Sequence, residues 1–218
     1  QEEFADTLLE LARADRNIVV VTSDSRGSAK LVRFGQVLPD QIIEMGIAEQ
    51  NLVGVAAGLA AMGKITFAVS PACFLTARSL EQIKNDMAYS DRPVKAIGIS
   101  AGVSYGALGT THHSLHDYAV LRTINNLTIL APGDNLETRA LIKAVIHYNK
   151  PVYLRLGKAP QPNLHAPTTP VEIGKSITLR DGDAVTFIAI GEALAPTYAA
   201  SQLLEREGLA CRVISMHT

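Results

Sequence analysis

The chain has 218 residues, 47% of them hydrophobic, and a formal net charge of -1 at pH 7. This length allows one well-packed core, or one domain and part of another, and the near-neutral charge indicates no nucleic-acid partner. The uncharged run from Leu52 to Met62 is too short to cross a bilayer, and the acidic start QEEF is unlike a signal peptide. Cys73 and Cys211 lie far apart and form no C-x-x-C pair, which suits a reducing compartment. We therefore expect a cytoplasmic protein that binds neither nucleic acid nor membranes.

Helix-like and strand-like segments alternate along the chain. Residues 2–15 have apolar side chains at helical spacing, and the β-branched run NIVVVT follows them. Helical patterns at 49–62, 74–89 and 134–148 separate further apolar runs, which read QIIEM, KITFAVS, VKAIGIS, LTILAP and VYLRL. The last helix begins with D-N-L-E, a capping-box-like start. Because hydrophobicity in the strand-like runs is continuous, the sequence predicts a three-layer α/β/α sandwich with a mostly parallel sheet.

A second unit follows the proline-rich segment KAPQPNLHAPTTP, residues 158–170, which is typical of an extended linker. The remaining residues show the pattern strand, helix, strand. An independent domain usually has on the order of 100 residues or more. We therefore expect a first domain at 1–160 and, at 171–218, the beginning of a second α/β domain that is cut short. Since the first residue is Gln rather than Met, we also expect the natural chain to begin earlier.

Glu49 stands at the predicted start of a helix, shortly before the uncharged run in IEMGIAEQNLVGVAAGLAAM. Two interpretations are open. Glu49 is either a solvated first-turn acid that complements the helix dipole, with Gly54 and Gly58 serving close packing, or a carboxyl held in an apolar site. In such a site the loss of hydration would let it share a proton with a ligand nitrogen.

Three of the six histidines fall within five positions in SYGALGTTHHSLHDYAVLR. His112 and His116 have the spacing of a helical metal pair, but the sequence is not H-E-x-x-H and no third ligand is evident. We therefore expect no metal site in this chain. The pattern favours a substrate-facing His on a Gly-rich loop, with His116 and Asp117 at the start of a helix.

Two arginines are candidates for anion binding, and a third has a structural interpretation. Arg155 ends the strand in PVYLRLGK and Arg26 follows the first strand, and ligands of open α/β sheets gather beyond the carboxyl ends of strands. A guanidinium there suits a phosphate. Arg78 lies three residues before Glu81 on a predicted helix, and this spacing favours a structural pair along one helix face.

Five blocks together, GIAEQNLVGVAAGLA, FLTARSLEQIKND, GVSYGALGTTHHSLHDYAVLR, LTILAPGDNLETR and PVYLRLGK, resemble the pyrimidine-binding domain of transketolases. The likeness covers residues 1 to about 160, and the tail from about 171 is similar to the start of the transketolase C-terminal domain. The resemblance implies the thiamine-diphosphate pyrimidine-binding fold and transfer of a two-carbon ketol unit between sugars.

The resemblance also assigns roles to single residues. The Glu that matches Glu49 hydrogen-bonds the aminopyrimidine ring of thiamine diphosphate and favours the imino tautomer that takes the C2 proton. Phe74 lies where the family places aromatic residues against that ring. His112 matches the His that contacts the sugar hydroxyls or carbonyl near the reacting carbon. Arg155 matches an Arg that binds the phosphate of the acceptor, and Arg26 is a candidate helper there.

Two departures from the family pattern bear on function. The Asp that recognises a sugar hydroxyl in full-length transketolases is replaced by Leu108, which indicates an altered sugar preference. The G-D-G segment with a later Asn, which fixes Mg²⁺ and the diphosphate, is missing. The GALGTTHH version of the His block is most similar to the C-terminal subunit of two-subunit transketolases. The resemblance thus implies a partner, the N-terminal subunit that carries the diphosphate and Mg²⁺ motif, in a two-fold heterotetramer.

Three other interpretations remain open. The β subunit of 2-oxo acid dehydrogenases and deoxyxylulose phosphate synthase share a Glu at this helix. YLRLGK and H-H-S-L-H-D favour transketolase over the former, and the missing Asp weighs against the latter. A non-catalytic assembly subunit is a further class, against which the presence of Glu49 and His112 argues.

Overall fold

A computed structural model describes residues 1–218. Its main feature is a six-stranded sheet with the order β2-β1-β3-β4-β6-β5, in which every neighbouring pair is parallel. The strands are β1 (Ile18–Thr22), β2 (Ile42–Glu44), β3 (Ile65–Pro71), β4 (Lys95–Ile99), β5 (Thr128–Leu130) and β6 (Val152–Arg155). All six coincide with the apolar runs of the sequence, and the predicted parallel sheet is confirmed.

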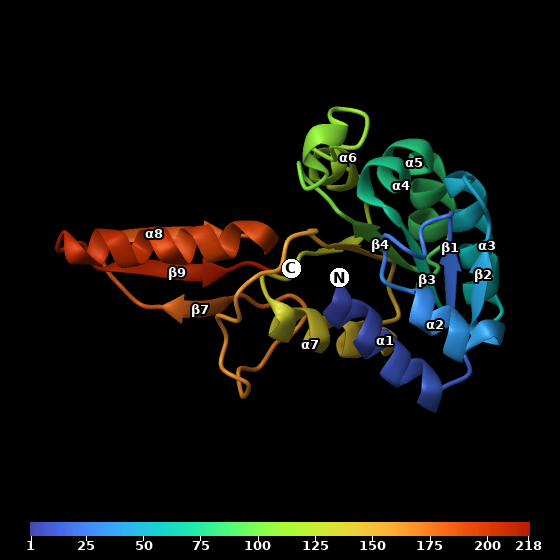
Figure 1. Ribbon diagram of the computed structural model, residues 1–218, viewed down its shortest axis with the longest axis horizontal. Coiled ribbons are helices and arrows are strands. Elements are labelled where there is room, and N and C mark those ends of the chain that lie inside the picture. Colours follow the sequence, from blue (N-terminus) through green and yellow to red (C-terminus); the bar gives the residue numbers. More distant parts are fainter.

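Helices cover both faces of this sheet, as Figure 1 shows. One layer contains α1 (Glu2–Ala14), α2 (Val32–Val37) and α7 (Asn135–Ile146), and it packs on the sheet around Phe4, Phe34 and Leu141. The other layer contains α3 (Glu49–Ala61), α4 (Ala72–Arg78), α5 (Leu80–Gln82) and α6 (Asp117–Leu121). Strands β1 and β4 are buried along their whole length between the two layers. The predicted α/β/α sandwich is therefore confirmed.

The helix predicted at 74–89 is broken into three pieces. A turn at Ser79 separates α4 from α5, and a π-helical segment, Ile83–Tyr89, follows. The hydroxyls of Thr76 and Ser79 donate to the carbonyls of Ala72 and Leu75, four residues earlier. Such back-bonding competes with the helical ladder and bends helices, which accounts for a break that apolar periodicity alone did not indicate.

The predicted N-terminus of α7 is confirmed, with one difference. The side chain of Asp134 accepts a bond from the Glu137 amide at 2.9 Å, as an N-cap does. Glu137 does not complete the reciprocal bond of a capping box, because its carboxylate accepts from the amide of Gly133 at 2.7 Å. Its other oxygen is thereby free for partners outside the helix.

The second unit lies at one end of the molecule (Figure 1) and is a three-stranded sheet with one helix. Its elements are β7 (Ile177–Arg180), β8 (Val185–Ala189), α8 (Leu194–Arg206) and β9 (Cys211–Ser215). The parallel β8-α8-β9 unit is as predicted. The sequence did not reveal β7, which pairs antiparallel with β9, because its four residues are only half buried and form no continuous apolar run.

Residues 158–170 form neither helix nor strand, as expected of a linker, but they are anchored. His165 is buried between Asp134 and Glu137, at 2.8 Å from Asp134 through Nδ1 and 3.1 Å from Glu137 through Nε2. Ser215 of the second unit donates to the same Glu137 carboxylate. We call His165, Asp134, Glu137 and Ser215 the clamp, because they tie linker, first unit and second unit together.

None of the helices is both long enough and apolar enough to span a membrane.

Candidate active site

The carboxyl ends of the parallel strands gather the candidate residues at one edge of the main sheet. Glu49 opens α3 shortly after β2, and α4, which directly follows β3, carries Phe74 and Arg78. The Gly-rich loop with His112 follows β4, and Arg155 is the last residue of β6. The site is therefore where a parallel α/β sheet places its ligands.

Glu49 is only 3% exposed, and its carboxylate has a single partner. The Nη1 atom of Arg78 donates to both carboxylate oxygens at 2.9 Å, from a side chain that is 46% exposed. Beside the pair is a shallow cavity of about 480 Å³ lined by Ile47, Ala48, Gln50 and Asn51. The solvated first-turn interpretation of Glu49 is thus wrong. The carboxyl is buried as the second interpretation requires, but its surroundings are polar and include the cation of Arg78.

The pairing of Arg78 with Glu81 that helical spacing favoured is also wrong. The chain turns at Ser79, between the two residues, and Arg78 reaches across to α3 instead. Glu49 and Arg78 are 29 positions apart, so no local pattern could have revealed their contact.

An aromatic row leads from this pair to the His loop. The guanidinium of Arg78 lies 4.3 Å from the ring centroid of Phe74, whose ring meets that of His112 edge-on at 5.2 Å. On its other side His112 meets Tyr105 edge-on at 5.3 Å, and the Nζ atom of Lys158 lies 4.7 Å above the Tyr105 ring. The structure thus brings Glu49, Phe74 and His112 together, as expected. Tyr105 was not among the predicted residues, although an aromatic residue directly before Gly106 of the loop was a usable signal.

The three clustered histidines have different surroundings. His116, at the start of α6 as predicted, donates from Nε2 to the Thr76 hydroxyl at 3.0 Å. His113 donates from Nε2 to the Gly106 carbonyl at 3.1 Å. His112 bonds through Nδ1 to Thr111 at 2.9 Å, and its Nε2 has no partner within the chain. His112 differs from the other two in lying between the rings of Phe74 and Tyr105, with its Nε2 available to a ligand. No group of three or more His, Cys, Asp or Glu side chains is arranged to hold a metal ion.

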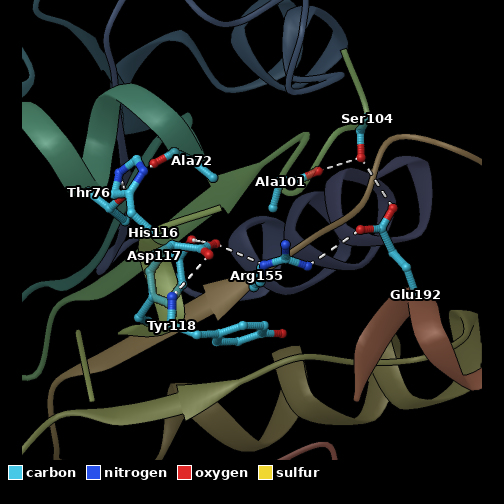
Figure 2. A network of polar contacts seen from close by, with 10 residues as sticks. Ala72, Thr76, Ala101, Ser104, His116, Asp117, Tyr118, Arg155 and Glu192 are labelled. Carbon is cyan, nitrogen blue, oxygen red and sulfur yellow. Dashed lines mark hydrogen bonds and ion pairs between the residues drawn. The ribbon is translucent and has the colours of Figure 1, made fainter. Parts of the chain in front are cut away.

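Arg155 lies at the strand end as predicted, but acids occupy two sides of its guanidinium (Figure 2). Its Nε donates to Asp117 at 2.8 Å, and its Nη1 lies 3.4 Å from Glu192 of the second unit. The side chain is only 12% exposed and stacks on Tyr118 at 4.7 Å. Burial alone would lower the pKa of Arg155, but Tyr118 and Asp117 outweigh it and raise the pKa, so the group stays cationic.

A larger cavity of about 660 Å³ adjoins this network. Its lining is mostly polar and includes Lys30, Ser100, Tyr105, Lys158 and Glu192. Lys30 forms an ion pair with Glu2 at 3.5 Å, whereas Lys158 forms none and rests on Tyr105. The aromatic row therefore connects this cavity with the Glu49 cavity.

Arg26 is placed apart from these residues. Its Nε lies 3.2 Å from Glu44 at the end of β2, and it lines neither the Glu49 cavity nor the larger one. Its assignment to the substrate stays a prediction.

Comparisons with known proteins follow the same division of the chain. Residues 1–162 match the family model of the transketolase pyrimidine-binding domain, and residues 174–218 match that of the transketolase C-terminal domain. Over 217 residues the chain is 50% identical to an apulose-4-phosphate transketolase subunit of Phocaeicola vulgatus, covering 99% of this chain and 70% of that protein. It is 34% identical over 218 residues to a 6-deoxy-6-sulfo-D-fructose transketolase subunit of a Clostridium species, covering all of this chain and 68% of that protein. A 1-deoxy-D-xylulose-5-phosphate synthase of Natranaerobius thermophilus is 33% identical, over 94% of this chain and 33% of that enzyme.

Solved structures agree with the fold. A split-gene transketolase, described as an inactive beta4 tetramer, superimposes with a TM-score of 0.89 at 36% identity, covering 99% of this chain and 69% of that one. The transketolase of Campylobacter jejuni gives the same TM-score at 18% identity, which supports the fold alone. With both units matched to family models, and with a relative that is 50% identical over 99% of this chain, the chain belongs to the transketolase family.

Proposed function

We propose that this chain is one subunit of a split, thiamine-diphosphate-dependent transketolase that transfers a two-carbon ketol unit from a ketose to an aldose with an anionic group. The observation that carries the proposal is Glu49, a nearly buried carboxylate that opens α3, faces a cavity and is linked through Arg78 and Phe74 to His112. The names of two relatives support the anionic group, since one refers to a sugar phosphate and the other to a sulfo sugar.

The residues present fit the aminopyrimidine end of thiamine diphosphate. Glu49 has only the one Arg78 nitrogen as a partner, which leaves its oxygens able to accept from a ring NH. Phe74 offers a ring against which a pyrimidine can pack, beside the same arginine. When bound, the cofactor supplies the carbanion chemistry that amino-acid side chains lack.

The chain's own residues then position the cofactor and handle the protons. Glu49 holds or shares a proton at the carboxylate oxygen that faces the pyrimidine ring. Arg78 then either leaves the carboxylate or stays bonded to only one of its two oxygens. His112 hydrogen-bonds a sugar hydroxyl or carbonyl through Nε2, because that nitrogen has no partner within the chain. Arg155 provides the positive charge for the anionic end of the acceptor.

A partner subunit completes the site in this proposal, by holding most of the contacts to Mg²⁺ and the diphosphate. The G-D-G segment that does so in full-length transketolases is not among these 218 residues. Helix α3 also presents small residues to the outside: Gly58 is exposed, and a Cβ atom there would meet nothing within 4 Å. Another backbone can therefore approach α3 closely, as in a heterotetramer with two copies of each subunit.

A deoxyxylulose-phosphate-synthase-like reaction is the second candidate, because such synthases are among the relatives. The exposed Leu108 replaces an acid on the loop before His112, and this departure weighs against it. The two reactions differ in the donor, which is a ketose for ketol transfer and pyruvate for the synthase.

The experiment is a donor comparison in the complex reconstituted with the partner subunit, thiamine diphosphate and Mg²⁺. We expect an anionic ketose to serve as donor and no release of CO₂ from pyruvate. Release of CO₂ from pyruvate at a higher kcat/KM than ketol transfer would favour the synthase and contradict the proposal. A reconstituted complex that binds the cofactor but turns over neither donor would indicate an assembly subunit.

A further inference from the structure

Glu192 is the one residue of the second unit that reaches the site network (Figure 2). It lies on the short 3-10 turn Gly191–Ala193, which leads into α8. One carboxylate oxygen lies 3.4 Å from Nη1 of Arg155, and the other accepts from the hydroxyl of Ser104 at 3.2 Å. Two elements of the first unit, β6 and the loop after β4, therefore hold this carboxylate.

The backbone around Glu192 leaves room for its side chain. Gly157 has no Cβ, and a Cβ atom built there would coincide with the Glu192 carboxylate. A Cβ at Gly102, which has a φ of 63°, would lie 3.1 Å from Nη2 of Arg155 and 3.8 Å from Glu192. Any other residue at 157 would expel the carboxylate from its place.

The position of Glu192 is also fixed by the contacts that hold the second unit against the first. The clamp and a backbone bond of 2.8 Å from the Ala131 amide to the His217 carbonyl hold the second unit against the first. Glu192 is therefore not a solvated surface acid that meets an arginine by chance.

Glu192 lines the larger cavity, whereas Arg155 does not. Its carboxylate stands on the cavity side of the guanidinium, and Asp117 holds the opposite side. An anion that enters from the cavity toward Arg155 would first meet a negative charge. Lys158, on the same wall, is a cation that no acid neutralises.

We propose that Glu192 is a specificity-determining residue that lowers the affinity of the site for anionic acceptors by neutralising Arg155 and repelling the anion. This inference rests on the proposed function of Arg155. An acceptor whose anionic group reaches both Arg155 and Lys158 is therefore favoured over one whose anion meets Arg155 alone. Specificity is then set by a repulsive element as well as by attractive contacts.

The test is the isosteric substitution Glu192→Gln, in the complex reconstituted with the partner subunit. Glutamine keeps the shape and can accept from Arg155 through its amide oxygen while its NH2 group donates to the Ser104 hydroxyl oxygen, so the charge is removed and one hydrogen bond is reversed. With a fixed ketose donor, ribose 5-phosphate and ribose form a matched pair of acceptors. We expect the KM for the phosphate to fall about tenfold while the KM for ribose and both kcat values stay within twofold.

The matched control is Glu205→Gln, which removes an acid of the same second unit that pairs with Arg180 away from the cavity. It should change neither KM. Equal changes for both acceptors in Glu192→Gln, or an unchanged ratio of the two KM values, would overturn the inference and indicate a purely structural ion pair. If the Gln variant melts well below the wild type, Glu192→Ala is compared in the same assay with the same two outcomes.

A second readout separates this inference from the proposed function. Inorganic phosphate is titrated calorimetrically into the purified chain and into its Glu192→Gln variant. About tenfold tighter binding by the variant would support the role of Glu192 even if no ketol transfer were found. Equal phosphate affinity would contradict it even in an active enzyme.

Discussion

The molecule contains two histidine sites with different surroundings. His165 is buried in the clamp with an acid beside each ring nitrogen, and the clamp joins the linker, α7 and β9. His112 lies on a Gly-rich loop between two aromatic rings, with one ring nitrogen unpartnered. The first site is enclosed by the fold and joins its parts. The second leaves a ring nitrogen to which a ligand can bond.

The two buried glutamates also differ in their partners. Glu137 accepts from Gly133 and from Ser215 and lies 3.1 Å from Nε2 of His165, so both of its oxygens have partners within the fold. Glu49 is nearly as buried but depends on one nitrogen of a half-exposed arginine. Burial alone therefore does not distinguish a site carboxylate from a structural one, whereas the number of its partners does.

The largest effect is expected at Glu49. Replacing it by Gln removes the carboxyl that shares a proton and keeps its shape, so kcat for ketol transfer should fall about 10⁴-fold with an unchanged melting temperature. The direct measurement is exchange of the C2 proton of bound thiamine diphosphate in the reconstituted complex. Exchange at the wild-type rate would show that Glu49 has another role. The control is Glu81→Gln, at the acid that sequence spacing placed beside Arg78. It should change neither kcat nor the exchange rate.

His112→Ala should produce the next largest effect. Loss of a donor to the sugar oxygens would lower kcat by about 10²-fold while the affinity for thiamine diphosphate stays within twofold. His113→Ala is the matched control, since its Nε2 is bonded to the loop carbonyl of Gly106. Weak cofactor binding as the main defect, with normal turnover at saturation, would contradict this role of His112.

Substitution of Arg155 tests whether an arginine that is already ion-paired still contributes to substrate binding. Loss of a charge-assisted contact costs about 1.5 to 3 kcal/mol, so Arg155→Ala should raise KM for anionic acceptors about 10- to 150-fold. Neutral acceptors should be affected little. Because the substitution also leaves the buried Asp117 without its cation, the melting temperature is measured in parallel. Equal KM changes for neutral and anionic acceptors would assign Arg155 a structural role.

The smallest effect concerns the clamp and is a pH dependence of stability. Burial would lower the pKa of His165, but Asp134 and Glu137 outweigh it and raise the pKa from 6.5 to about 9. Because the pKa of His165 is raised, protonated His165 stabilises the fold fully below pH 6.5. This stabilisation is lost as the pH rises through about 9. The pKa values of Asp134 and Glu137 are lowered, so their contribution is lost only in acid. Burial lowers the pKa of the neighbouring His217, which therefore stays neutral across this alkaline window.

We therefore expect the contribution of His165 to the free energy of unfolding to fall on the order of 2 kcal/mol between pH 6.5 and 9.5. Burial lowers the pKa of Lys95 to about 7, which gives the whole chain an opposing pH dependence, so the contribution is measured as the difference between the wild type and His165→Gln in chemical denaturation at both pH values. His165→Gln should be less stable than the wild type at pH 6.5, and this difference should be smaller at pH 9.5. A variant with the same pH slope as the wild type would show that the clamp is not the titrating group.

The sequence predicted the elements well and the contacts between them poorly. The six strands of the main sheet could be predicted because continuous apolar runs indicate strands that are covered on both faces. Glu49 and His112 were singled out from local patterns, and Phe74 through the resemblance to transketolases. The pairs Glu49–Arg78, Arg155–Asp117 and Arg155–Glu192 join residues 29 to 38 positions apart, and no local period reports such contacts.

The clamp was missed for a related reason. His165 lies in a proline-rich segment whose composition indicates an exposed linker, and its partners come from α7 and β9. The break of the predicted helix at Ser79 was missed because the spacing of apolar residues contains no information on side-chain hydroxyls that donate to carbonyls one turn earlier. In both cases a polar interaction decided the local structure, while the predictions relied on apolar patterns.

The central claim is that this chain contributes one half of an active site that a partner subunit completes. It is tested most directly by titrating the purified partner into the purified chain, with saturating thiamine diphosphate and Mg²⁺, and measuring the initial rate of ketol transfer. We predict no rate above background without the partner and a rise that saturates at one partner per chain. A full rate from the chain by itself would contradict the claim.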